Sequence, residues 1–185
     1  RQRSRVINIP QTTNSGHAPG EHLVAILCSP PLRSPETTTS WKNLTVLQQV
    51  LGAATFDILN VIDQPTRSTT ELEVTDGQLD LYLLESRVRA AAQGAGTIVA
   101  AWGTRAPGRW PRYAWQDLIQ ATGQGLQAAG HSRLLHVGPT PRHPSRWRQH
   151  TSPVHCRYPG DTFEQRLLAA LHDSSVAALT GNRAL

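Results

Sequence analysis

His143 is the residue whose type and setting in this sequence best suit catalysis. It lies in the string Pro141-Arg142-His143-Pro144-Ser145, which follows a short apolar run. An imidazole at the carboxyl end of a strand can donate a hydrogen bond to an oxyanion or to a departing base. The competing interpretation is a structural histidine that caps a turn. We therefore take His143 as the first candidate catalytic residue.

Two segments combine arginine with tryptophan. Residues 142–150 (RHPSRWRQH) hold three arginines and Trp147, and residues 105–112 repeat the mixture. Guanidinium groups bind phosphates and an indole ring can stack on a flipped or single-stranded base. The alternative is a pair of solvated basic loops. The expected polyanion-binding rim consists of Arg105, Arg109, Arg142, Arg146 and Arg148.

Polar residues also follow the second apolar run, residues 56–62. Asn60 could hydrogen-bond a base edge or tie two strand ends together, and Asp63 could position a water or simply form a turn. Cys28 and His143 could form a nucleophile–base pair, but Cys28 ends an apolar run, which favours a buried structural thiol. Trp102 ends another such run and is expected to pack under the site, against a bound base.

Metal and cofactor motifs are weak in this sequence. His150, His155 and Cys156 are zinc-ligand types, but their spacing matches no standard finger and a fourth ligand is not apparent. Cys28 and Cys156 cannot by themselves supply a disulfide framework or a four-cysteine cluster. No phosphate-loop or dinucleotide fingerprint occurs. We expect no metal and no cofactor.

Charge is distributed unevenly along the chain. Of 18 cations, 17 are arginine, and residues 101–160 carry eight arginines against Asp117 alone, a balance of +7. Residues 36–100 carry four basic and eight acidic groups, a balance of −4. This asymmetry points to a polyanionic partner, although a GC-rich genome also favours arginine.

The 185 residues suit one compact domain, with an irregular arm over residues 1–20 and a single domain over 21–185. No run of 18 apolar residues and no basic-then-apolar leader is present, so we expect a soluble, cytoplasmic protein with no membrane partner. The sequence begins at Arg1 and lacks methionine, so its start is expected to be processed and receives no targeting meaning. The oligomeric state is left open.

Four apolar runs predict buried strands, separated by stretches of helical periodicity. The predicted strands cover residues 23–28, 56–62, 97–102 and 133–137, and the predicted helices cover 44–51, 79–92, 113–129 and 163–179. This alternation predicts a three-layer α/β fold with a central, mostly parallel four-stranded sheet flanked by helices. Ligands of such sheets bind at the carboxyl ends of the strands. The candidate site therefore comprises Cys28–Pro30, Asn60–Asp63, Trp102-Gly103 and Pro141–Ser145.

The strings LVAILCSPP, LNVIDQPT, IVAAWG and TPRHPSRW resemble a bacterial domain of unknown function, the family numbered sixteen forty-three. The resemblance covers residues 22–148. Trp102-Gly103, Asn60 and Pro141-Arg142-His143-Pro144 match the family pattern as they stand. In the first block the family asparagine falls on Ser29, its proline on Pro30 and its serine on Pro31.

The same order of blocks resembles the uracil-DNA glycosylase superfamily. That resemblance implies a water-positioning group after the first strand, where Ser29 and Pro30 stand. It also implies a histidine after the fourth strand that stabilises the departing base, where His143 and Ser145 stand. A serine hydroxyl orients water but is a poor base. The first hypothesis is a glycosylase-like domain that binds nucleic acid or a nucleotide and processes a base as an N-glycosidase-type hydrolase. The second hypothesis is a catalytically silent nucleic-acid-binding or interaction module of the same fold.

Overall fold

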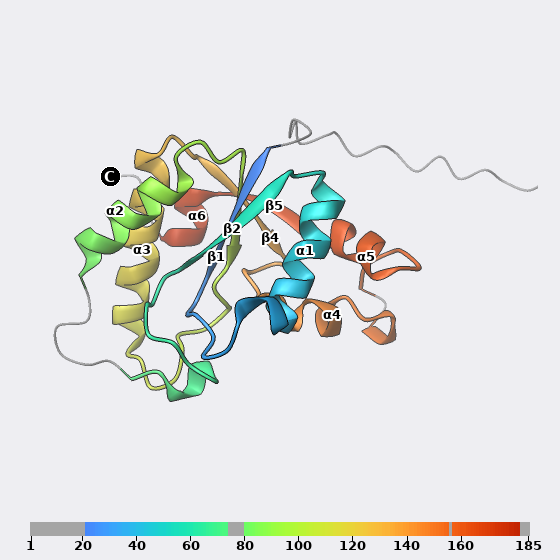
Figure 1. The fold of residues 1–185 in the computed structure, drawn as a ribbon, viewed down its shortest axis with the longest axis horizontal. Coiled ribbons are helices and arrows are strands. Elements are labelled where there is room, and N and C mark those ends of the chain that lie inside the picture. The colour runs from blue at the N-terminus through green and yellow to red at the C-terminus, as the bar shows by residue number, and fades with distance from the viewer. Residues whose placement is uncertain (1–20, 74–79, 156, 182–185) are drawn as a thin grey trace, which may run out of the picture.

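The computed structural model describes residues 21–73, 80–155 and 157–181, and the expected arm over residues 1–20 lies outside them. The described residues form a central sheet with helices on both faces (Figure 1). The strands are β1 (His22–Leu27), β2 (Thr55–Asn60), β3 (Thr97–Ala101), β4 (Arg133–Val137) and β5 (Leu171–Ser175). The helices are α1 (Thr39–Leu51), α2 (Leu81–Ala92), α3 (Arg112–Ala128), α4 (Trp147–His150), α5 (Phe163–Ala169) and α6 (Val176–Thr180). Short 3-10 turns η1 (Pro35–Thr37), η2 (Thr69–Glu71), η3 (Pro144–Arg146) and η4 (Pro153–His155) lie between them.

The sheet has the order β2-β1-β3-β4-β5, in which the first four strands are parallel and β5 is antiparallel to β4. The predicted α/β class and mostly parallel sheet are confirmed. The predicted strand count was too low by one. Each of the four expected strands forms within two residues of its predicted bounds.

β1 shows why these apolar runs form strands. Leu23, Ala25 and Leu27 point to one face, Val24 and Ile26 to the other, and all five are buried. A strand covered on both faces needs apolar side chains at every position, because successive residues point in opposite directions. α1, α4 and α5 cover the first face, while α2, α3 and α6 cover the second (Figure 1).

The predicted helix over residues 163–179 is wrong in its middle. The chain leaves α5 after Ala169, forms β5 and then begins α6 at Val176. Residues 171–175 (LHDSS) pair with β4, where the His136 ring stacks on His172 and its Nε2 lies 2.9 Å from Ser174 Oγ. Asp and Ser are poor helix formers, so pairing with the open edge of β4 outweighs the apolar periodicity. Thr162 and Gln165 form a capping box at the start of α5.

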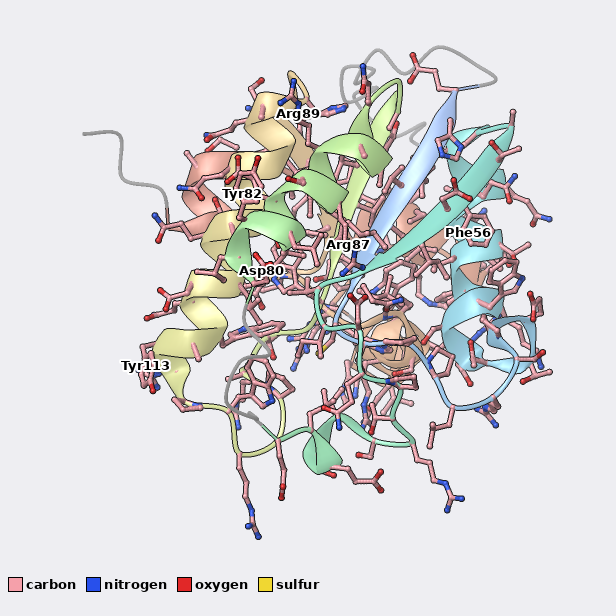
Figure 2. All side chains as sticks on the ribbon, turned by 60° about the vertical axis from the view of Figure 1, so that its left-hand side comes forward. Phe56, Asp80, Tyr82, Arg87, Arg89 and Tyr113 are labelled. Carbon is pink, nitrogen blue, oxygen red and sulfur yellow. The ribbon has the colours of Figure 1, made fainter. Side chains whose placement is uncertain are left out.

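α2 buries one face against the sheet and exposes the other. Leu84 is buried with Val88 and Ala92, whereas Leu83 is 51% exposed. Figure 2 shows Tyr82 on α2 and Tyr113 on α3 pointing away from the sheet. α3 lies within one residue of its predicted bounds, and its Leu118, Ile119 and Leu126 are buried.

Candidate functional site

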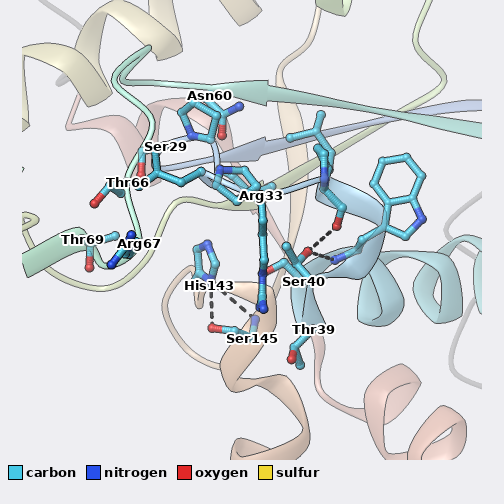
Figure 3. A pocket seen from close by; sticks show the side chains of 18 of the residues that line it. Ser29, Arg33, Thr39, Ser40, Asn60, Thr66, Arg67, Thr69, His143 and Ser145 are labelled. Atoms are coloured by element: carbon cyan, nitrogen blue, oxygen red, sulfur yellow. Dashed lines mark hydrogen bonds between the residues drawn. The ribbon is translucent and has the colours of Figure 1, made fainter.

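A cavity of about 1100 Å³ lies at the carboxyl ends of β1 and β2 (Figure 3). Its wall comes from the segments after β1, β2 and β4 and from the first turn of α1. From β1 the chain crosses to β2, toward one edge of the sheet. From β3 it crosses to β4, toward the opposite edge. Parallel sheets bind ligands beside such a reversal of strand order. The lining is rich in hydroxyl groups, from Ser29, Thr38, Thr39, Ser40, Thr66, Ser68, Thr69 and Ser145.

The cavity brings together five residues proposed from sequence. They are far apart in the chain but share this wall: Ser29, Pro30, Asn60, His143 and Ser145. Leu27 pairs with Asn60 across the sheet, so β1 and β2 end at the same level. Five of the residues that the strand-end argument named therefore line one cavity, while Trp102, Gly103 and Asp63 do not.

His143 both caps a turn and lines the cavity. Its Nδ1 accepts the backbone N–H of Ser145 at 3.4 Å and lies 2.9 Å from Ser145 Oγ. Because the backbone N–H can only donate, Nδ1 is the unprotonated nitrogen and the proton belongs on Nε2. The Nε2–H group is thus the one left to donate to a ligand. The two interpretations of His143 made from sequence are compatible.

The surroundings of His143 favour the neutral ring. Burial, together with the nearby positive charge of Arg146, lowers the pKa of His143 to about 4. At neutral pH the side chain is therefore an uncharged donor. A neutral imidazole whose proton position is set by a hydrogen bond is a known electrophilic catalyst for developing negative charge.

A buried asparagine holds the histidine turn against α1. Asn43 is fully buried, and its Nδ2 donates to the carbonyl oxygen of Pro144 at 2.7 Å. Arg148 Nε donates to Asn43 Oδ1 at 3.1 Å, and its guanidinium lies 4.1 Å from the Phe163 ring centroid. Asn43 thus fixes the turn after His143, and the Arg148 side chain has a structural role in addition to any polyanion contact.

The side chains of Ser29 and Asn60, which line the cavity next to the ends of β1 and β2, differ in their hydrogen bonding. Ser29 is 9% exposed, and a hydrogen bond links its side chain to Cys28. Asn60 Oδ1 is buried and has no hydrogen-bond partner among the described residues. A buried amide oxygen without a partner is costly, so a ligand that donates to Asn60 would relieve that cost.

The surroundings of Cys28 disfavour a role as nucleophile. Burial raises the pKa of its thiol to about 12, so little thiolate exists at neutral pH. Cys28 packs in the apolar core and is not part of the cavity lining. The structural interpretation of Cys28 holds, and the proposed Cys28–His143 pair is not formed in the cavity.

Asp63 lies outside this cavity. Its carboxylate forms an ion pair with Arg87 of α2, whose Nη2 also donates to the Asn60 carbonyl oxygen at 3.3 Å. Asp63 lines a separate cavity of about 110 Å³ beside Trp110. Figure 2 shows Arg87 on the side of α2 that faces β2. The expectation that Asp63 could position the attacking water does not agree with this placement.

The two tryptophans expected at the ligand are core residues. Trp147 is fully buried under α1 and α5, and its Nε1 donates to the Arg142 carbonyl oxygen at 2.8 Å. Trp102 is 5% exposed and packs on the opposite face of the sheet. The indole of Trp147 is therefore not a stacking surface, while Trp102 packs in the core, without lining the cavity.

The five arginines of the expected rim do not line the cavity. Arg105 and Arg109 are exposed in the β3–α3 loop, and Arg146 is exposed beside His143. Arg142 is half-buried, and its Nε has no hydrogen-bond partner among the described residues. The cavity instead contains two arginines that the sequence argument missed, Arg33 and Arg67.

The N-terminal turn of α1 was also missed. The predicted helix began at residue 44, but α1 begins at Thr39 and is capped by Thr38, whose Oγ1 accepts the N–H of Trp41 at 3.1 Å. The string of threonines and a serine ahead of the apolar positions is a capping signal that could have revealed this start. It places Thr39, Ser40 and Trp41 on the cavity wall.

Within the described ranges, no three His, Cys, Asp or Glu side chains gather closely enough to hold a metal ion. His150 Nε2 instead lies 2.9 Å from Tyr158 Oη, and Cys156 falls outside those ranges. None of the described helices has the length and apolar character needed to cross a membrane.

Comparison with known proteins adds no relative: no family model, curated protein or solved structure matches this chain.

Two histidines, the half-buried His143 and the buried His150, make folding stability depend on pH. Burial is the main cause that lowers the pKa of both His143 and His150 from 6.5 to about 4, with nearby arginines adding to it. Between these pH values the unfolded chain binds more protons than the folded one, so stability falls as pH falls through this window. Each histidine contributes a slope of at most about 1.4 kcal/mol per pH unit.

Urea unfolding between pH 6.5 and 5 measures this slope, because carboxyl groups of ordinary pKa contribute little there. His143→Asn and His150→Asn should each reduce the slope of unfolding free energy against pH. The double variant should reduce that slope further. A wild-type slope of zero, or three variants with the wild-type slope, would contradict the assignment.

Proposed function

We propose that the cavity binds a nucleobase as part of a nucleotide or nucleic acid, and that the protein is a uracil-DNA glycosylase-like domain. The observation that carries the proposal is the neutral His143, which presents a free Nε2–H in a cavity shared with Ser29 and Asn60. Three of the four sequence blocks behind the family resemblance contribute to that cavity. Its volume of about 1100 Å³ is sufficient for a nucleotide.

The proposed roles follow from the donors and acceptors present. Asn60 carries an amide whose Oδ1 is unpaired, and it reads the edge of the base. His143 donates from Nε2 to the oxygen or nitrogen of the base that gains negative charge. Ser29 orients the water. No described Asp or Glu lines the cavity, so the water is oriented without a carboxylate base.

In the proposed reaction a water oxygen forms a bond to the sugar C1′ while the C1′–N bond breaks. The electron pair of that bond stays on the base, where the His143 hydrogen bond stabilises it. The attacking water loses a proton to solvent, and the base later gains one. The reaction is therefore hydrolysis of an N-glycosidic bond and needs no cofactor.

The second candidate is a silent nucleic-acid-binding or interaction module. The lack of a carboxylate in the described lining favours it, because serine is a weak water activator at neutral pH. In both cases exposed Arg105, Arg109 and Arg146 contact phosphates outside the cavity, as guanidinium groups do.

A base-release assay separates the two candidates. The chain is incubated with single-stranded and duplex oligonucleotides that carry uracil or another altered base, and fluorescence anisotropy measures binding in parallel. The enzyme hypothesis predicts free base and abasic sites, and the silent module predicts binding alone. Asp63→Asn is the matched control, since Asp63 lies outside the cavity, and it should leave both readouts unchanged. Absence of release and of binding would overturn the proposed function.

A further inference from the structure

The cavity carries positive charge that no described acidic residue of its lining balances. Arg33 and Arg67 both line it, and no described Asp or Glu does. Neither guanidinium forms a hydrogen bond or an ion pair within the described part of the chain. Two free guanidinium groups in one cavity favour an anionic ligand.

The two loops that carry these arginines are held together. Pro31 and Thr66 form a parallel bridge, and the Thr66 N–H donates to the Pro30 carbonyl oxygen at 3.0 Å. Arg33 lies two residues after Pro31, and Arg67 directly follows Thr66. The backbone thus keeps both arginines on the same cavity although they lie on different loops.

The first turn of α1 adds donors to the same wall. Thr38 caps α1, because its Oγ1 accepts the N–H of Trp41. The N–H groups of Thr39 and Ser40 have no partner among the residues that the structure describes. α1 has 13 residues and no acidic residue in its first turn. The amino end of such a helix carries partial positive charge and free N–H groups that bind phosphate.

The arginines lie farther from the strand ends than the base-reading groups do. In Figure 3, Asn60 and Ser29 lie at the strand ends, while Arg67, next to Thr69, lies on one side of His143 and Ser40 and Thr39 lie on the other. The Arg33 side chain extends past His143 toward Ser40 and Ser145. A ligand with a base at one end and an anion at the other would fit this division.

We propose that Arg33, Arg67 and the amino end of α1 form a phosphate subsite, so that the ligand of the cavity is a phosphate ester of a nucleoside. This inference rests on the proposed function. Phosphate is favoured over carboxylate because two guanidinium forks, two backbone N–H groups and several hydroxyls exceed what one carboxylate can accept. The phosphate can belong to a free nucleotide or to a nucleotide within a strand.

Isothermal titration calorimetry tests the subsite with five kinds of probe. They are inorganic phosphate, the four common nucleosides, their 5′-monophosphates, a single-stranded oligonucleotide and the same oligonucleotide with a 5′-phosphate. The wild type should bind at least one monophosphate about tenfold or more tightly than its nucleoside, the gain from a charge-assisted hydrogen bond. Tighter binding of the oligonucleotides than of every monophosphate would assign the phosphate to a strand, and the reverse to a free nucleotide.

Arg33→Gln and Arg67→Gln should each remove most of that gain while leaving nucleoside affinity unchanged. Arg105→Gln is the matched control, since Arg105 is an exposed arginine outside the cavity, and it should leave monophosphate affinity as in the wild type. Equal binding of nucleoside and monophosphate, or equal effects of the three variants, would overturn the subsite and leave the proposed function standing. Binding of phosphate with no contribution from any base would support the subsite and overturn the proposed function. Absence of binding by every probe would overturn both.

Discussion

Replacing His143 with alanine should lower base release by on the order of 10²-fold, the usual loss when one preorganised donor to a developing charge is removed. The reason is specific to this geometry. Ser145 occupies Nδ1, burial keeps the ring neutral, and the Nε2–H is the donor that remains for the departing base. The rate is measured as free base released per enzyme under single-turnover conditions.

The same experiment needs a control for folding and one for binding. Asp63→Asn alters an exposed ion pair outside the cavity and should retain the wild-type rate. His143→Ala should keep most of its affinity for the oligonucleotide, because the hydrogen bond to the base strengthens as negative charge develops. Equal rates for wild type, His143→Ala and Asp63→Asn would show that His143 only caps its turn, and the binding module would then be the better account.

Trp147→Ala should lower the free energy of unfolding by about 3–5 kcal/mol, the range for removing a fully buried aromatic side chain. The indole lies in the core between the sheet, α1 and α5, and its Nε1 donates to the Arg142 carbonyl oxygen. The variant loses packing and leaves that carbonyl without its donor. Urea unfolding followed by circular dichroism measures the change.

Trp147→Phe separates the loss of packing from the loss of the hydrogen bond, since it retains most of the ring volume but not the N–H. It should lower the free energy of unfolding by less than Trp147→Ala does. Arg146→Ala alters the neighbouring exposed residue and should change stability by less than about 0.5 kcal/mol. A Trp147→Ala protein of wild-type stability that binds nucleic acid poorly would instead support a stacking role for the ring.

The parallel sheet was predictable because its strands are buried on both faces. Such strands require apolar residues at every position, which makes them visible as continuous runs, as in β1 and β3. Once the runs are parallel, their carboxyl ends must share one edge. The sequence therefore predicts that Ser29, Asn60 and His143 lie at one edge of the sheet, and all three line the cavity.

The fate of residues 171–175 was not predictable from periodicity. The pattern of apolar residues continues from α5 through α6, and a helix satisfies it as well as a helix–strand–helix does. The chain forms β5 because β4 offers an open edge, with His136 available to both His172 and Ser174. That edge exists only in the folded sheet.

The division between cavity and core also depended on local turns. Asp63 lies three residues after Asn60, but the chain turns after β2, and the charge of Arg87 on α2 holds the carboxylate outside the cavity. Ser145 and Trp147 are two residues apart, but the helical turn of η3 and α4 points one into the cavity and the other into the core. Residue type alone did not distinguish these positions.

The sequence by itself therefore determined the parallel strands, the edge at which they end and the identity of the histidine there, since burial on both faces and the direction of the strands leave local signals. Only the tertiary structure decided that Arg33, Arg67 and the first turn of α1 complete the cavity, and that Trp147 and Asp63 do not. Those positions depend on contacts between segments distant in the chain, such as the Pro31–Thr66 bridge and the Asn43–Pro144 hydrogen bond. Such contacts leave no periodic pattern in either partner.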